Sequence, residues 1–200
     1  TVKDAAGNTS TASLSIQVID SILPTLSVQN LVLYLDSFGK AFTHVDSADN
    51  GTFDNCGIAS LTLSQDTLDC SHVGDNTITF TATDKNNNQN STTLTITVYD
   101  TLAPTLVLQQ DTVYLDTAAY AFIVDTDIIA YSYDNCGIDS VLISQTEFGL
   151  SDTNVVTVWV TLKDKNGNQT GPDSVLVYVM ISDSDSDGIM DYLEGGGDND

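Results

Sequence analysis

The sequence predicts an all-β protein built from two consecutive antiparallel β-sandwiches of about 80 residues each. The first observation is an internal repeat, because residues 21–100 recur in register as residues 101–180 without insertion or deletion. The string Asp-Asn-Cys-Gly-Ile at 54–58 returns at 134–138. A fixed period of this length is typical of an array of one small domain, and it favours a modular protein over an enzyme.

The second observation is the alternation of apolar and polar residues. Leu, Ile, Val, Phe or Ala occupy every second position in residues 14–18, 78–82 and 94–98. A period of two with many Thr and Val residues indicates half-buried antiparallel strands. Asn-rich segments at 84–88 and 164–168 separate strands and suit hairpin turns. Short strands at this spacing predict a sandwich in each repeat.

One strand departs from this register. In the last strand of the second repeat, Val175, Val177 and Val179 have the parity that holds Thr in the first repeat. Gly171-Pro172 precedes them. A bulge at Gly171-Pro172 would shift the register by one residue and keep the valines inside the core.

The repeat sets the expected domain boundaries. Residues 1–20 are expected to be the C-terminal part of a preceding repeat, because Asp-Ala-Ala-Gly-Asn at 4–8 aligns with the later hairpin turns. The two sandwiches are expected at 21–100 and 101–181. An acidic segment at 182–200 follows and is expected to bind calcium.

The composition excludes several functions. A formal net charge of −23 with only five Lys and Arg residues disfavours binding to nucleic acid or to an anionic membrane surface. No apolar run is long enough to insert into and cross a bilayer. Nearly all acidic residues are Asp, which suits turns and calcium loops. The abundance of Ser, Thr and Asn and the few cysteines indicate a secreted protein.

Three strings carry a family resemblance. Residues 54–58, Leu-Asp-Cys at 68–70 and residues 73–84 resemble the HYR (hyalin repeat) family of immunoglobulin-like domains. The most similar variant occurs in tandem in surface proteins and adhesins of gliding bacteria that use type IX secretion. The Asp-Ala-Ala-Gly-Asn and Asp-x-x-x-Pro-Thr strings also resemble calcium-bridged bacterial immunoglobulin-like adhesin repeats. The resemblance covers residues 1–181. It implies immunoglobulin-like sandwiches, an extracellular location at the cell surface, and a role in adhesion or spacing.

The resemblance also implies a disulfide. In that family the pair equivalent to Cys56 and Cys70 is usually bonded, and the alternative is two reduced thiols. The second repeat has Leu150 in place of Cys70, so Cys136 is expected to have no partner within its own repeat. A buried, inert thiol and an intermolecular bond are the two possibilities for Cys136.

Each repeat junction is expected to gather oxygen ligands. In an immunoglobulin-like sandwich the chain enters beside the final hairpin loop, so Asp20 should approach Asp84, and Asp100 should approach Asp164. Two further residues lie on a loop that opens towards the same end: Asp54 and Asp134. Converging carboxylates make a site for a hard cation such as Ca²⁺. The alternative is that each Asp starts a turn and caps its own backbone.

Residues 183–194 match a calcium-binding loop. Oxygen ligands fall at positions 1, 3, 5, 9 and 12, a backbone carbonyl falls at position 7, and Gly188 stands at position 6, where such a loop turns sharply. These ligands are Asp183, Asp185, Asp187, Ile189, Asp191 and Glu194. A strand precedes the loop, so it resembles a thrombospondin type 3 or dockerin-like loop instead of a full EF-hand.

The sequence therefore predicts a non-catalytic stalk or spacer of a secreted, calcium-stabilised surface adhesin or filament protein. Its expected partners are neighbouring repeats of the same chain. One alternative is that the repeats bind surface glycans or proteins, with Trp159, expected to face outward, as a contact. Another is an accessory segment of a secreted hydrolase. No nucleophile elbow, phosphate loop or zinc spacing in the sequence favours catalysis.

Overall fold

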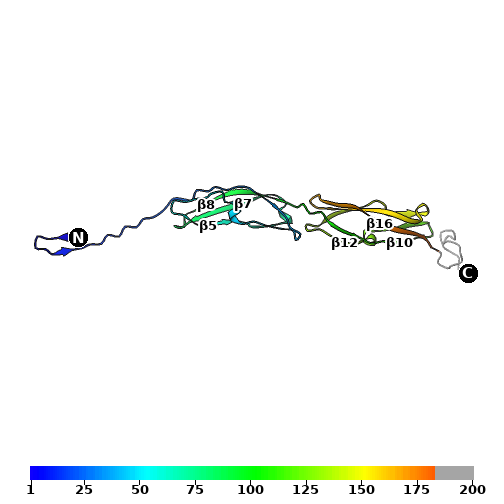
Figure 1. The fold of residues 1–200 in the computed structure, drawn as a ribbon, viewed down its shortest axis with the longest axis horizontal. Helices are drawn as coiled ribbons and strands as arrows, with labels where there is room; N and C mark the ends of the chain where they lie inside the picture. The colour runs from blue at the N-terminus through cyan, green and yellow to red at the C-terminus, as the bar shows by residue number, and fades with distance from the viewer. Residues whose placement is uncertain (183–200) are drawn as a thin grey trace. The chain divides into compact units, whose positions relative to one another are not determined.

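The computed structural model describes residues 1–182 (Figure 1). They are mostly strand, as the alternation predicts. The N-terminal hairpin is β1 (Val2–Lys3) and β2 (Thr9–Ser10). The first repeat contains β3 (Leu31–Tyr34), β4 (Lys40–Phe42), α1 (Val45–Ala48), β5 (Ile58–Leu63), β6 (Thr67–Asp69), a 3₁₀ turn (Cys70–His72), β7 (Gly74–Asp84) and β8 (Gln89–Tyr99).

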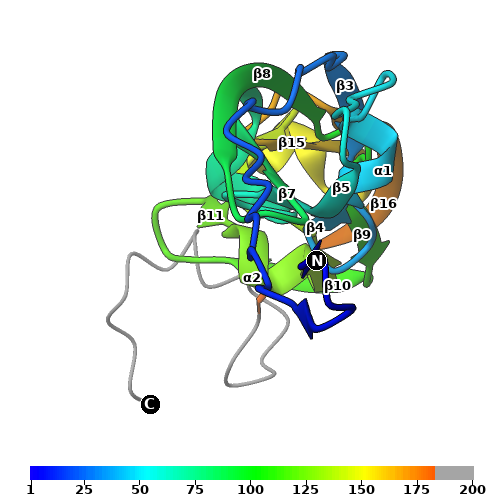
Figure 2. The same ribbon diagram turned by 90° about the vertical axis from the view of Figure 1, so that its left-hand side faces the viewer.

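The second repeat has the same order of elements. They are β9 (Thr105–Leu108), β10 (Asp111–Leu115), β11 (Tyr120–Phe122), α2 (Asp125–Ile128), β12 (Ile129–Tyr133), β13 (Ile138–Ile143), β14 (Glu147–Gly149), a 3₁₀ turn (Leu150–Asp152), β15 (Asn154–Asp164) and β16 (Gln169–Ile181). Helices α1 and α2, labelled in Figure 2, are single turns of four residues, which is too short for a helical period to show in the sequence.

Each repeat contains one four-stranded sheet and shorter strand pairs. The sheet order is β3-β8-β7-β5 in the first repeat and β10-β16-β15-β13 in the second. The short pairs are β4 with β6, β11 with β14, and β12 with β9. Strands β5, β6 and β7 begin 80 residues before β13, β14 and β15, so the period of the sequence is also the period of these strands.

Contacts divide the chain into two compact units. One comprises Thr1–Leu31, His44–Asp66 and Thr77–Thr95, and the other comprises Val32–Thr43, Thr67–Asn76 and the chain from Ile96 onwards. Two segments of the first repeat therefore belong to the same unit as the second repeat. The boundaries expected from the sequence repeat stay a prediction.

The prediction of purely antiparallel sheets is wrong for one pair. Strand β10 runs parallel to β16, with Asp111 opposite Val177 and Leu115 opposite Ile181. A parallel pair needs a long crossover connection, and here the rest of the repeat provides it. The hairpin turns visible in the sequence indicate only antiparallel neighbours.

The core consists of the predicted inward-facing residues. Leu94, Ile96 and Val98 of β8 are buried, as are Phe80 and Ala82 of β7. The predicted strand at 14–18 is absent: residues 11–20 form no strand, and Leu14, Ile16 and Val18 are 78–91% exposed. Their apolar face matches that of β8, but none of the described residues covers it.

The predicted bulge at Gly171-Pro172 is confirmed. Val160 pairs with Asp173 and Leu162 pairs with Thr170, so two residues of β16 stand opposite Thr161. The consequence is the one expected from the sequence, because the valines at 175, 177 and 179 are all buried.

Gly171→Ala is expected to destabilise the second repeat. Gly171 has a φ of +70°, and a Cβ there would lie 2.5 Å from the Asp173 nitrogen and 3.1 Å from the Val160 oxygen. We expect a loss of about 2–3 kcal/mol in unfolding free energy, measured by urea denaturation. The control is Gly167→Ala, since Gly167 also has a positive φ (+96°) but no atom within 4 Å of its Cβ position. Equal losses in the two variants would contradict the steric explanation.

No helix among residues 1–182 is long and apolar enough to span a bilayer.

Candidate metal centres and the disulfide

Two groups of three carboxylates lie 80 residues apart. The first carboxylate group is Asp20, Asp54 and Asp84, and the second is Asp100, Asp134 and Asp164. Within each group, one oxygen of every residue lies within 4.8 Å of the others. The predicted approach of Asp20 to Asp84, and of Asp100 to Asp164, is thus present. The sequence indicated Asp54 and Asp134 only as residues of a nearby loop, and the recurrence of Asp-Asn-Cys-Gly was the signal for them.

Each group joins three segments of chain. Asp20 and Asp100 lie just before the first strand segment of a repeat, and the second residue of each group opens an Asp-Asn-Cys-Gly turn. The third, Asp84 or Asp164, is the last residue of the long central strand, β7 or β15. The sequence-distant ends of three loops therefore meet at one point in each group.

The third residue of each group organises its own hairpin turn. One oxygen of Asp84 accepts hydrogen bonds from the Asn86 and Asn88 amides at 2.8 Å, and the other accepts one from Asn88 Nδ2 at 2.7 Å. Asp164 makes the same bonds with Asn166 and Asn168. Burial opposes ionisation of Asp84, but the bonds from Asn88 and Asn86 outweigh it and hold its pKa below the usual value. The turn-capping alternative is therefore correct for this position.

Turn capping does not account for the other two residues of each group. One oxygen of Asp54 accepts from the Cys56 and Gly57 amides, and one oxygen of Asp134 accepts from the Cys136 amide at 2.8 Å. In the described part of the chain, the second oxygen of four residues is buried and accepts no hydrogen bond. These residues are Asp20, Asp54, Asp100 and Asp134. A buried acceptor without a donor is unfavourable unless another group satisfies it.

The donor set fits a hard divalent cation. Three carboxylates within 4.8 Å repel one another, and a bound cation removes both this repulsion and the unmet need of the buried oxygens. Oxygen atoms are the ligands that Ca²⁺ prefers. The neighbouring amide Asn88 Nδ2 donates to the Asp20 carbonyl at 3.3 Å, and Asn168 Nδ2 donates to the Asp100 carbonyl at the same distance, which holds the entering chain in place.

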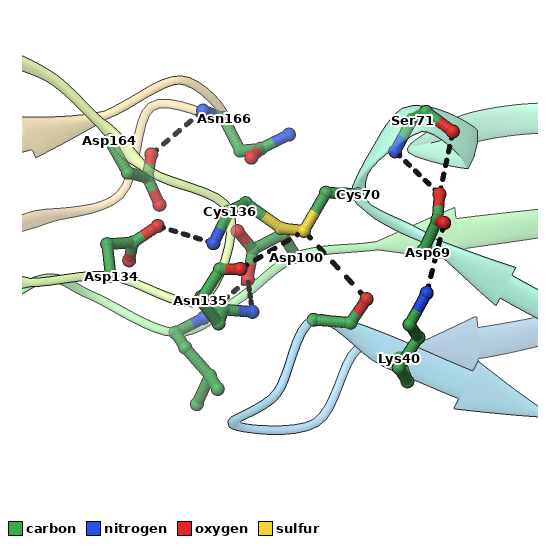
Figure 3. The surroundings of a disulfide bond; sticks show 12 residues. Lys40, Asp69, Cys70, Ser71, Asp100, Asp134, Asn135, Cys136, Asp164 and Asn166 are labelled. Carbon is green, nitrogen blue, oxygen red and sulfur yellow. Dashed lines mark hydrogen bonds and ion pairs between the residues drawn. A yellow bond between two sulfur atoms is a disulfide. The ribbon is translucent and has the colours of Figure 1, made fainter.

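The implied Cys56–Cys70 disulfide is wrong. Cys70 is bonded instead to Cys136, with the Cα atoms 5.4 Å apart, and among the described residues Cys56 is the free cysteine (Figure 3). Cys56 lies next to Ile58, which pairs with Asp84 at the C-terminal end of β7, whereas Cys70 lies just before the N-terminal end of β7. Eleven strand residues span about 33 Å, and a disulfide requires Cα atoms within about 7 Å.

Cys136 therefore has a partner, although it lies outside its own repeat. The bond joins the second Asp-Asn-Cys-Gly turn to a surface of the first repeat that we call the tip, which consists of the turn at 36–40 and the 3₁₀ turn Cys70–His72. All of these residues belong to one compact unit. The expectation of a buried, inert thiol at Cys136 is wrong.

Hydrogen bonds surround the disulfide. Asn135 Nδ2 donates to the Asp36 carbonyl at 3.2 Å and to the Asp100 carboxylate at 3.1 Å, and the Tyr133 hydroxyl donates to the Ser37 carbonyl at 3.2 Å. Asn135 thus connects the tip directly to the second carboxylate group, as Figure 3 shows.

Asp69 fixes the turn that presents Cys70. Its carboxylate accepts hydrogen bonds from the Ser71 hydroxyl at 2.6 Å and the Ser71 amide at 3.0 Å, and it pairs with Lys40 Nζ at 3.1 Å. These bonds, led by the one from the Ser71 side chain, hold the pKa of Asp69 well below its usual range.

Gly39→Ala is expected to disrupt this contact. Gly39 has a φ of +70°, and a Cβ there would lie 2.7 Å from both the Asn135 carbonyl oxygen and the Cys70 sulfur. The equivalent residue of the second repeat is Ala119, which adopts a φ of +58°, so the backbone conformation alone tolerates Ala. We expect Gly39→Ala to lower the unfolding free energy by about 2–3 kcal/mol in urea denaturation. Ala119→Gly serves as the control and should change it by less than about 1 kcal/mol. A neutral Gly39→Ala variant would show that the tip does not pack as described.

Two further predictions have different outcomes. The predicted calcium loop, with ligands Asp183, Asp185, Asp187, Ile189, Asp191 and Glu194, lies outside the described residues. Trp159 of β15 faces outward as expected and is 49% exposed.

Residues 19–98 match the family model described as the HYR domain, which confirms the predicted resemblance over this part of the chain. No curated protein matches the sequence. Among solved structures, the chain is similar to the EC1-2 fragment of human mucin-like protocadherin, with 9% identity, a TM-score of 0.37, and coverage of 78% of this chain and 98% of that chain. The EC1-2 fragment of human protocadherin-24 has 11% identity, a TM-score of 0.36, and coverage of 76% and 95%. The Ig1-2 module of the Drosophila receptor protein tyrosine phosphatase DLAR has 9% identity, a TM-score of 0.24, and coverage of 80% and 100%.

Proposed function

We propose that this chain is a calcium-stiffened, non-catalytic spacer segment of an extracellular adhesion protein. The observation that carries the proposal is the pair of carboxylate groups whose buried oxygens have no hydrogen-bond donor among the described residues. The match of residues 19–98 to the HYR domain supports the adhesive or structural class and the extracellular location.

The position of each group explains how calcium would act. A cation bound by Asp100, Asp134 and Asp164 would join the chain entering the second repeat, its Asp-Asn-Cys-Gly turn and its final hairpin. Millimolar extracellular calcium suits sites of this kind, because extracellular modules bind calcium with dissociation constants of about 10⁻⁴–10⁻³ M. Loss of the ion would leave three like charges at the entry of each repeat and loosen the segment there.

The C-terminal loop 183–194 adds a further proposed calcium site. Its ligand spacing supports it, independently of the two carboxylate groups. Direct binding of a glycan or protein is a second candidate function, and the half-exposed Trp159 on the outer face of β15 favours it. Binding of a glycan by the isolated chain, with quenching of Trp159 fluorescence, would favour this second candidate.

Small-angle X-ray scattering tests the spacer function. Chelation of calcium should shorten the maximum dimension of the particle, because the entry of each repeat would become flexible. The control is the double variant Asp54→Asn/Asp134→Asn, whose dimension should not respond to chelator apart from any effect of the C-terminal loop. A parent chain with the same dimension in calcium and in chelator would contradict the proposal.

A further inference from the structure

We infer that the surface of the first repeat around Cys56 is the docking site for the tip of a preceding repeat, and that Cys56 forms a disulfide with a cysteine at that tip. The inference does not depend on calcium. It rests on the equivalence of Cys56 with Cys136, which makes such a bond within the described chain.

The two cysteines are presented by the same local structure. The Cys56 amide donates to the Asp54 carboxylate at 2.8 Å, and the Cys136 amide donates to the Asp134 carboxylate at 2.8 Å. The glycines that follow have φ values of +98° and +96°. Because Cys136 bonds to Cys70, which lies 66 residues earlier, the same register places the partner of Cys56 at a tip 80 residues before Cys70.

The surface beside Cys56 has the residues of a docking site but no tip against it among the described residues. In the second repeat, Leu102, Ala103 and Tyr133 line a pocket together with Ser37 of the tip. The equivalent residues of the first repeat are Ile22, Leu23 and Phe53, which are 59%, 52% and 63% exposed. Three large apolar side chains gathered at one surface indicate a protein contact.

The adjacent asparagine gives a second sign of a missing partner. Asn135 Nδ2 donates to the Asp36 carbonyl of the tip, whereas Asn55 Nδ2 donates to the Cys56 sulfur at 3.4 Å. The Asn55 amide therefore has the position to reach a tip, and it now contacts the thiol that would be oxidised.

The tip of the second repeat cannot supply the partner, because Leu150 stands where Cys70 stands in the first repeat. The partner is thus the tip of another repeat that has a cysteine at the Cys70 position. Residues 1–20 indicate where that repeat lies, since Asp4 binds the amide and side chain of Asn8 as Asp84 binds those of Asn88.

Formation of the bond removes two protons and two electrons from the two thiols. A disulfide oxidoreductase accepts them, and its own disulfide is reduced to a dithiol as the new sulfur–sulfur bond forms.

The test extends the whole chain by one repeat. A second copy of residues 21–100 is inserted after Asp100, which places the first Cys70 against the Cys56 of the inserted copy. Of five cysteines, only the first Cys56 should then react with a thiol reagent under native conditions, whereas the parent chain should also show one reactive thiol among three. Changing the first Cys70 to Ser should raise the count in the extended chain from one to two, and the Cys70–Cys136 link of the inserted copy should persist in non-reducing mass mapping. Three reactive thiols in the unmodified extended chain would overturn the inference.

A second observation does not depend on folding of the extended chain. The natural protein chain one repeat upstream should have a cysteine 80 residues before Cys70. A different residue at that position would equally overturn the inference.

Discussion

Asp134→Asn is expected to remove one bound calcium ion and to change the stability of the chain in opposite directions with and without calcium. Asn retains one oxygen that can accept from the Cys136 amide, so the turn should persist. The substitution removes one charge from the second carboxylate group and replaces the buried, unsatisfied oxygen. In chelator the variant should melt at a higher temperature than the parent, because the repulsion among three carboxylates is reduced.

In calcium the order should reverse. A site saturated at 100 times its dissociation constant stabilises the folded state by about 2.7 kcal/mol, and the variant should lose most of this contribution at one site. Titration calorimetry should show one calcium equivalent fewer than in the parent. The matched control is Asp139→Asn, which removes one exposed carboxylate of β13 outside both groups and should leave the stoichiometry unchanged. Equal stoichiometry in Asp134→Asn and the parent would exclude Asp134 as a ligand.

Cys136→Ser is expected to destabilise the unit that contains the second repeat by about 4 kcal/mol. The disulfide closes a loop with a sequence separation of 66 residues, and the chain-entropy model gives an effect of that size. Trp159 is the only tryptophan and lies in β15, so its fluorescence during urea denaturation reports on this repeat. The transition should move to a lower urea concentration.

Cys56→Ser is the control for the loss of a thiol. Cys56 is exposed and free in the described chain, so its replacement should leave the midpoint within about 0.5 kcal/mol of the parent. Non-reducing mass mapping should find the Cys70–Cys136 link in the control and no link in Cys136→Ser. An unchanged midpoint in Cys136→Ser would show that the bond contributes no stability.

The fold was largely predictable because its signals are local. Alternation of apolar residues identified β7, β8 and β15, and the shifted parity of three valines identified the bulge at Gly171-Pro172. The parallel pairing of β10 with β16 was not predictable in this way, since it depends on residues more than 50 positions apart. The strand expected at 14–18 failed for a related reason: an apolar face forms a strand only where another strand pairs with it.

The carboxylate groups were partly predictable from the same repeat. Asp20, Asp84, Asp100 and Asp164 came together as the order of strands implied. The disulfide was not predictable from one repeat alone, because the nearest cysteines along the sequence lie at opposite ends of β7. The cysteine without a partner in its own repeat, Cys136, was the signal that the bond joins two repeats.

The Cys70–Cys136 bond also determines how the chain would carry tension. A force applied at the two ends of the chain passes from Cys70 directly to Cys136, so the residues between them, including all of β7 and β8, bear no load. Those strands could not be pulled apart while the bond is intact. Its reduction would release about 220–240 Å of extended chain from the 66-residue separation, so the redox state of one bond would set how far this segment lengthens under load.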